Sequence, residues 1–136
     1  MKSPHLRPLF LGLLALIGLC GTAAAADIAW DGDAGNGTWS DPLNWAGDVA
    51  PGAGDRAVFS AGSGTVTIAG AVSIAGIETS GTWTGTILQQ APVTLSGSWN
   101  VLAGTWDAGA QTISVGGNAT IAASAVFLRG TSTVQL

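Results

Sequence analysis

The sequence predicts an all-β protein built as a parallel β-solenoid, in which short strands stack coil upon coil behind a tryptophan-rich cap. Three observations predict it. Short runs alternate apolar and small polar residues, glycines recur between the runs, and the pattern repeats about every twenty residues. Period-two alternation is typical of strands with one buried face. No window carries the apolar stripe of an amphipathic helix.

The first 26 residues predict a secretory signal peptide, so we expect the protein to be exported, to the extracellular space or to the cell surface in association with the outer membrane. Lys2 makes the start basic, residues 9–19 are apolar, and residues 24–26 are alanines suited to cleavage before Asp27. The apolar run is shorter than the roughly 20 residues that span a bilayer, so the mature part is not expected to cross a membrane. Cys20 leaves with the leader, and no other cysteine occurs.

Residues 27–60 predict an irregular N-terminal cap. This segment holds three of the six tryptophans, Trp30, Trp39 and Trp45, together with six of the eight acidic residues. The end of a solenoid exposes unpaired backbone and an open core, which a cap must cover to prevent edge-to-edge aggregation. Large indole side chains at this place are suited to that role.

Residues 61–136 predict the solenoid coils. Val93 aligns with Ile113 and Thr133 at a step of twenty residues. The same step aligns Leu95 with Val115, Gly97 with Gly117, and Val101 with Ile121, and a step of twenty-one aligns Val72 with Val93, Ile74 with Leu95, and Gly76 with Gly97. The glycines that punctuate the runs are expected at turns or bends. They are Gly70, Gly76, Gly81, Gly85, Gly97, Gly104, Gly109, Gly116 and Gly117. An antiparallel β-sandwich of short strands is the alternative, since it also spaces its strands evenly.

The segment 30–59 carries a set of motifs in a fixed order. They are Trp30-Asp31-Gly32, Gly37-Thr38-Trp39, Asn44-Trp45, Pro51, Asp55 and Ala57-Val58-Phe59. In order and spacing they resemble the start of the passenger regions of bacterial autotransporter-associated β-strand repeat proteins, which are large secreted or surface-displayed β-helix proteins and often adhesin-like. The resemblance implies a right-handed parallel β-helix displayed outside the cell, and it carries no catalytic residues. Because the sequence stops at Leu136 inside an apparent strand, we expect further coils of the same chain beyond it.

We therefore expect a structural, adhesin-like extracellular segment whose partners are extracellular glycans or a host or matrix surface. Two alternatives stay open: a glycan-binding β-sandwich module, and the N-terminal fragment of a β-helix polysaccharide lyase or hydrolase. Residues 27–136 contain two arginines, Arg56 and Arg129, against eight acidic residues, a formal net charge of −6. Such a surface repels nucleic acid and anionic membranes.

Catalysis is not expected from the residues available. Residues 27–136 contain no His, Cys, Lys or Tyr, which excludes the common nucleophilic triads and a His- or Cys-based zinc site. Most of the acidic residues stand beside Gly, Pro or Asn, where Asp commonly forms turns. We expect no enzyme activity and no cofactor.

Two groups of residues remain candidates for binding. Asp31, Asp33 and Asn36 offer oxygen ligands on a glycine-rich turn and are a candidate calcium site, although they do not fit the EF-hand pattern. Trp83 and Trp106 each follow Gly-Thr and are candidates for stacking on a glycan, or on one another. The competing interpretation is structural for both groups, with Asp in turns and Trp in the core. Trp99 alternates in phase with inward positions and is expected to fill the core.

Overall fold

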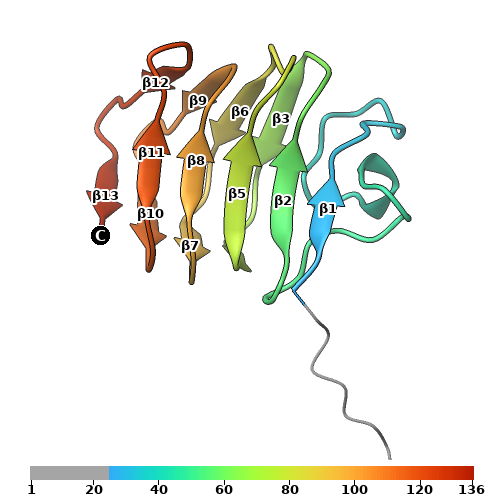
Figure 1. Cartoon of the computed structure of the whole chain (residues 1–136), viewed down its shortest axis with the longest axis horizontal. Coiled ribbons are helices and arrows are strands. Elements are labelled where there is room, and N and C mark those ends of the chain that lie inside the picture. The colour runs from blue at the N-terminus through green and yellow to red at the C-terminus, as the bar shows by residue number, and fades with distance from the viewer. Residues whose placement is uncertain (1–24) are drawn as a thin grey trace, which may run out of the picture.

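The computed structural model describes residues 25–136, and it shows a β-solenoid of about four turns (Figure 1). The regular elements of that part of the chain are thirteen short strands and one short 3-10 helix. Every pairing between its named strands is parallel. The predicted solenoid is confirmed, and the antiparallel β-sandwich is not formed.

The strands make three sheets along the solenoid, and each turn of the chain visits every sheet once. The first sheet contains β1 (Asp27–Ala29), β2 (Arg56–Phe59), β5 (Gly76–Thr79), β8 (Trp99–Val101) and β11 (Ala119–Ile121). The second contains β3 (Thr65–Ile68), β6 (Thr86–Gln89), β9 (Thr105–Asp107) and β12 (Val126–Leu128). The third contains β4 (Val72–Ile74), β7 (Val93–Leu95), β10 (Thr112–Val115) and β13 (Thr133–Gln135).

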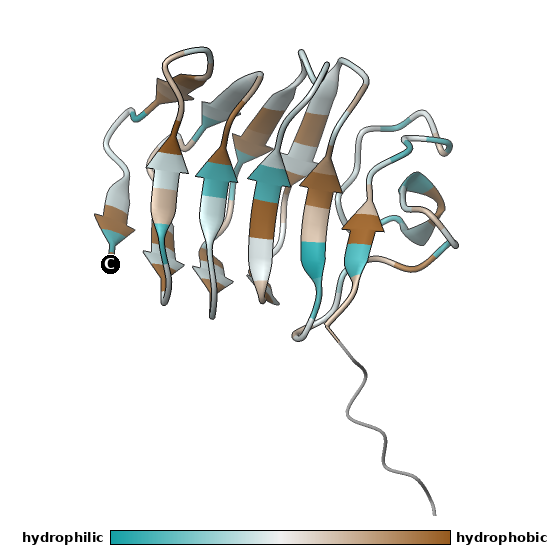
Figure 2. Ribbon diagram, in the orientation of Figure 1, coloured by the Kyte–Doolittle hydropathy of each residue, from teal (hydrophilic) through white to brown (hydrophobic). Residues whose placement is uncertain are grey.

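Alternate side chains of each strand point into the core, as the period-two pattern predicts. In β6, for example, Ile87 and Gln89 are buried while Thr86 and Leu88 are partly exposed. Figure 2 shows the same alternation as apolar bands crossing the strands. Residues paired in register form continuous inward rows, among them Val66, Ile87, Trp106 and Phe127, and Val72, Val93, Ile113 and Val134.

The predicted register is confirmed for most of the coils. The pairs found as predicted are Val72 with Val93, Ile74 with Leu95, Val93 with Ile113, Leu95 with Val115, and Val101 with Ile121. Gly97 and Gly117 are also neighbours, because the Gly117 N–H donates to the Gly97 carbonyl at 2.9 Å. The repeat of about twenty residues therefore corresponds to one turn of the solenoid.

Two predicted alignments were wrong by one residue. Ile113 pairs with Val134, whereas Thr133 pairs with Thr112. The Gly97 N–H donates to the carbonyl of Ala75 rather than lying beside Gly76. The corner between β11 and β12 and the corner between β7 and β8 each hold one residue more than the equivalent corner of the preceding coil. A one-residue slip inside a strand would turn every side chain to the wrong face, so the corner and not the strand accommodates the extra residue.

The cap closes two of the three sheets at the N-terminal end. β1 adds a strand to the first sheet, where it pairs with β2. Residues 37–39 lie alongside β3 in the second sheet: the Trp39 N–H donates to the Thr67 carbonyl at 3.1 Å, and the Thr67 N–H donates to the Gly37 carbonyl at 2.7 Å. The predicted cap, 27–60, thus includes two strands, and its irregular part is the loop between β1 and β2.

An aromatic cluster seals the core beneath this loop. Trp45 is fully buried, and its ring centroid lies 5.0 Å from that of Trp30, 4.8 Å from that of Trp39 and 5.6 Å from that of Phe59. The Trp45 indole N–H donates to the Trp39 carbonyl at 2.7 Å. Edge-to-face pairs with a satisfied indole are the favourable arrangement for buried tryptophans. The structural role predicted for these three tryptophans is confirmed.

A buried amide organises the loop from inside. Asn44 ends the 3-10 helix η1 (Pro42–Asn44) and is fully buried. Its Oδ1 accepts from the Ala34 N–H at 3.1 Å, and its Nδ2 donates to Asn36 Oδ1 at 2.7 Å and to the Thr38 carbonyl at 3.0 Å. A buried amide with three partners fixes the loop, because each group left unpaired would cost free energy.

The predicted leader falls mostly outside the described residues. Of residues 1–26, the structure describes Ala25 and Ala26 only. Within residues 25–136 no helix has the length and apolar character needed to cross a membrane.

Candidate functional site

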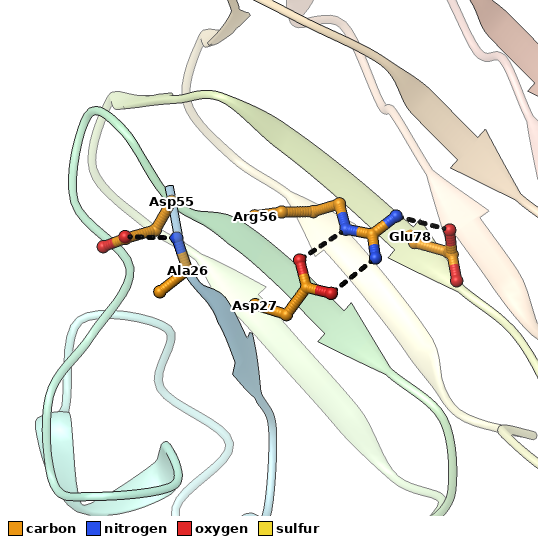
Figure 3. Close-up of polar contacts among 5 residues, drawn as sticks. All are labelled: Ala26, Asp27, Asp55, Arg56 and Glu78. Atoms are coloured by element: carbon orange, nitrogen blue, oxygen red, sulfur yellow. Dashed lines mark hydrogen bonds and ion pairs between the residues drawn. The ribbon is translucent and has the colours of Figure 1, made fainter. Parts of the chain in front are cut away.

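The charged side chains of the first sheet meet in one cluster at the start of β1 and β2 (Figure 3). Arg56 binds Asp27 through two hydrogen bonds, Nε to Oδ1 at 2.8 Å and Nη2 to Oδ2 at 2.6 Å. Its Nη1 donates to Glu78 Oε2 at 2.9 Å. One arginine therefore links β1, β2 and β5 across the outer face of the sheet.

The electrostatics of this cluster favour a structural ion pair between strands over a catalytic acid–base pair. The hydrogen bond from Arg56 holds the pKa of Asp27 below its ordinary value, and the same hydrogen bond raises the pKa of Arg56. Both groups therefore keep their charges at neutral pH, whereas a general acid or base needs a pKa near the working pH. The cluster thus holds β1, β2 and β5 together through charge-assisted hydrogen bonds.

Asp55 stands at the edge of the same cluster, just before β2. Its Oδ2 accepts from the Gly52 N–H at 2.8 Å, and its Oδ1 accepts from the Ala26 N–H at 3.3 Å. Its backbone carbonyl accepts from the Ala75 N–H at 2.8 Å. Asp55 thus joins the beginning of the described chain to the corner between β4 and β5.

The candidate calcium ligands are engaged in turns. Asp31 Oδ1 accepts from the Asp33 N–H at 3.2 Å, and Asn36 Oδ1 accepts from the Thr38 N–H at 3.0 Å as well as from Asn44. Within residues 25–136 no three His, Cys, Asp or Glu residues lie close enough to hold a metal ion. The Asp31 and Asn36 side chains thus make the short-range hydrogen bonds to backbone N–H groups that Asp and Asn commonly make in turns.

The candidate glycan-stacking tryptophans lie in the core. Trp83 is 2% exposed and packs against Phe59 at 5.1 Å between ring centroids, and Trp106 is fully buried and packs against Trp99 at 5.3 Å. Stacking on a sugar requires an exposed ring face, and neither ring offers one. They also do not pair with one another, because Trp106 lies within β9 whereas Trp83 lies in the loop before β6. The inward position predicted for Trp99 is confirmed.

Three glycines from successive coils make room for the Trp83 indole. A Cβ added at Gly85 would lie 2.4 Å from Trp83 Cζ2, and one added at Gly104 would lie 2.5 Å from Trp83 Cδ1. At Gly62 the added Cβ would lie 3.5 Å from Cζ3 of the same ring. The glycines predicted only as bends at positions 85 and 104 therefore have a second role, the close approach of an aromatic ring.

Gln89 is a core residue that sequence reasoning missed. It points inward from β6 and is 2% exposed. Its Oε1 accepts from the Trp106 indole N–H at 3.2 Å, and its Nε2 donates to the carbonyls of Ala91 at 3.1 Å and Thr112 at 2.9 Å. The sequence offered one signal of this role. In the alternating pattern of Thr86–Gln89, Gln89 falls on an inward-facing position, where an apolar side chain is usual.

The outer faces of the second and third sheets carry neutral hydroxyls, which we call the hydroxyl rows. Register places Thr65, Thr86 and Thr105 side by side on the second sheet, and Ser73, Thr94 and Ser114 side by side on the third. Neighbours in such a row are about 4.8 Å apart, the spacing of adjacent strands. The rows offer hydrogen bonds without charge along the length of the solenoid.

Shallow grooves flank these faces, and none of the grooves described here is lined by an ionisable side chain. One, of about 370 Å³, lies between the cap loop and β4. It is lined by Trp39, Ser40, Ala50, Pro51 and residues 69–74. A second, of about 310 Å³, lies beside residues 35–37, and a third, of about 410 Å³, lies at the corners before β6 and β9.

The last coil exposes apolar side chains. β11 and β13 are exposed along their whole length, and β12 is exposed except at Phe127. The exposed large apolar residues of this coil are Ile121, Val126, Leu128, Val134 and Leu136. Strand edges with apolar side chains are ready templates for further pairing.

Comparison with known proteins gives no relative from which a site could be transferred. No protein-family model matches the chain, no curated protein matches it, and no solved structure matches it. The functional argument therefore starts from the fold and its surfaces.

Proposed function

We propose that this chain is an exported, structural and adhesin-like β-solenoid segment of a secreted or surface-displayed bacterial protein. Its role is to present an elongated surface outside the cell for contact with extracellular glycans or a host or matrix surface. The observation that carries the proposal is the parallel stack of coils, sealed at the N-terminal end and bordered by the hydroxyl rows.

The architecture supports presentation because each coil adds length without adding a cavity. Inward rows such as Val93 with Ile113 fill the interior from coil to coil. A stack of this kind exposes long, regular outer faces, which repeat proteins commonly use as binding surfaces. The sequence resemblance of the cap to autotransporter-associated β-strand repeat proteins points in the same direction.

The chemistry of the outer faces supports a neutral, polar partner. The hydroxyl rows donate and accept hydrogen bonds, and residues 27–136 carry a formal charge of −6 with two arginines. One of these, Arg56, is already bound by Asp27 and Glu78. Anionic polymers are therefore disfavoured relative to neutral glycans.

We propose that the segment is not catalytic. The carboxylates of Asp27 and Glu78 are both held by Arg56, and the grooves described above are lined by Gly, Ala, Ser, Thr, Asn, Pro and apolar residues. General acid–base catalysis needs a titratable group within reach of a bound substrate. This arrangement favours a binding or structural role over a lyase or hydrolase site within these coils.

Export is tested by expressing the whole chain in a Gram-negative host and locating it with an antibody raised against the folded coils. We expect the protein outside the cytoplasm with its leader removed. The matched control is Leu14→Arg, which interrupts the apolar run and should retain the chain in the cytoplasm. Wild-type protein found in the cytoplasm with its leader intact would contradict the proposal.

Surface contact is tested by retardation of the purified protein in gels containing neutral polysaccharides or matrix glycoproteins. Replacing Thr86 and Thr94 by Val removes two hydroxyls from the rows at nearly constant shape, and we expect the retardation to fall. Thr120→Val on the outer face of the first sheet is the control and should leave it unchanged. Equal retardation of all three proteins would exclude the hydroxyl rows as the contact surface.

A further inference from the structure

The structure bears on where the leader is removed, because the predicted cleavage region runs into the folded part of the chain. Several bonds in the stretch 21–27 satisfy the requirement for small residues, among them Ala26–Asp27, preceded by Ala24 and Ala26, and Ala25–Ala26, preceded by Ala23 and Ala25. The sequence does not distinguish them. The first cut removes Ala26 from the mature protein, and the second keeps it.

Ala26 is part of the first sheet rather than of the leader. Its carbonyl accepts from the Arg56 N–H at 2.8 Å, which extends the pairing of β1 with β2 by one residue. Its N–H donates to Asp55 Oδ1 at 3.3 Å, as Figure 3 shows. Cleavage after Ala26 would remove the Ala26 carbonyl and the Ala26 N–H from the mature protein. The Arg56 N–H would then lack its acceptor, and Asp55 Oδ1 would lack its donor.

We propose that leader removal cuts the Ala25–Ala26 bond, and that the new α-ammonium of Ala26 forms an ion pair with Asp55. Water adds across the amide, which leaves a carboxylate on Ala25 and an amino group on Ala26 that is protonated at neutral pH. The enzyme is a leader peptidase of the export machinery, so the inference rests on the proposed export.

The charges around Ala26 favour this terminus. The cluster in Figure 3 holds three carboxylates, Asp27, Asp55 and Glu78, against the single guanidinium of Arg56. Asp27 and Glu78 both bind Arg56, whereas within residues 25–136 Asp55 Oδ1 accepts a hydrogen bond from the Ala26 N–H alone. A positive charge placed on the Ala26 nitrogen therefore meets the one carboxylate of the cluster that the arginine does not bind. A charged donor strengthens a hydrogen bond that is long for a neutral amide.

The position of the cut is read from the exported wild-type protein by intact mass and N-terminal sequencing. We expect the mature chain to begin at Ala26. A chain beginning at Asp27, or at any other residue, would overturn this inference and leave the proposed export standing. A chain that keeps its leader would overturn both.

The ion pair is tested on purified protein beginning at Ala26. Lys2 is the sole lysine of the sequence, so this protein has a single amine, and an acetylating ester neutralises the α-ammonium alone. We expect acetylation to lower the melting temperature by about 2–4 °C. The same treatment should have no effect on Asp55→Asn, while the cap variant Asp33→Asn should respond like wild type. No decrease in wild type, or an equal decrease in Asp55→Asn, would overturn the pairing.

Discussion

The buried amide of Gln89 shows how a single polar side chain holds two coils together. It joins the indole of Trp106 in β9 to the carbonyl of Ala91 in the corner after β6 and to the carbonyl of Thr112 in β10. All of its hydrogen-bonding partners belong to the protein, so its removal leaves several buried groups unpaired at once. Such groups cost more than the net gain of an ordinary hydrogen bond.

We expect Gln89→Leu to lower the free energy of unfolding by about 2–3 kcal/mol, because the Trp106 N–H loses its acceptor and two carbonyls lose a donor. Gln90→Leu is the matched control, since the next side chain is exposed and should change stability by less than about 0.5 kcal/mol. Urea unfolding followed by tryptophan fluorescence measures both. Equal midpoints for the two variants would show that the amide network contributes nothing.

Gly85→Ala tests the close approach of the Trp83 ring. The added methyl group would lie 2.4 Å from the indole and 2.7 Å from the Gly64 carbonyl, so the backbone must shift. We expect a loss of about 2 kcal/mol or more in urea unfolding. Gly70→Ala is the control, because its Cβ meets nothing within 4 Å. That variant should be neutral or slightly stabilised.

Not all of these roles could be predicted from the sequence. The inward phase of Trp99 follows from alternation within its own strand, so local pattern was enough. The position of Trp83 depends on glycines in two other coils, Gly62 and Gly104, which lie far from it in sequence. Their proximity becomes visible only when the coils are in register.

At the scale of the strands, Arg56 joins β1 to β2 through its bidentate pair with Asp27. Because the pKa of Asp27 is lowered in the folded state, the pair stabilises the fold above the unfolded pKa of about 3.9. That stability is lost as pH falls through the lower, folded pKa. The contribution is small, since the Asp27 side chain is 60% exposed.

We therefore expect wild type to be slightly more stable than Asp27→Asn at pH 6, and the difference to be smaller at pH 3, below the unfolded pKa of about 3.9. Urea midpoints of the two proteins at both pH values measure it. High salt at pH 6 should also reduce the difference, because it screens an exposed pair. A difference that grows on acidification would contradict the lowered pKa.

The register of the strands was predictable from the repeat, and its errors have a common cause. Val72, Val93 and Ile113 align in sequence and in space because each lies at the same place in its strand. Thr133 was misplaced because the corner between β11 and β12 holds one residue more than the corner between β8 and β9. The number of residues in a corner is hard to predict from the hydrophobic pattern, because corners bury few side chains.

At the scale of the whole molecule, the two ends differ. The N-terminal end is sealed by the cluster around Trp45, whereas the last coil leaves the edges of β11, β12 and β13 exposed. The parallel solenoid and its cap could be predicted from repeats and tryptophans. A ligand could not, because the sequence left Trp83 and Trp106 open between glycan stacking and a core position, and the folded coils bury both rings.

We expect a purified protein that ends at Leu136 to associate through the last coil in a concentration-dependent manner, because exposed edges pair readily. Val126→Lys combined with Val134→Lys adds two charges to that coil and should shift the population toward monomer in sedimentation velocity. Val49→Lys in the cap loop is the control, since Val49 is 60% exposed and lies at the other end of the chain. An effect of Val49→Lys equal to that of the pair would exclude the last coil as the contact.

From β2 onward, the distance along the chain between paired residues varies, from nineteen residues between Thr86 and Thr105 to twenty-two between Ile77 and Trp99, while the strands stay in register. The corners thus already tolerate insertions and deletions. An exposed corner such as the one at Gly70 should therefore accept a grafted peptide epitope without disturbing the rows beneath it, which makes this small coil stack a natural scaffold for engineered display.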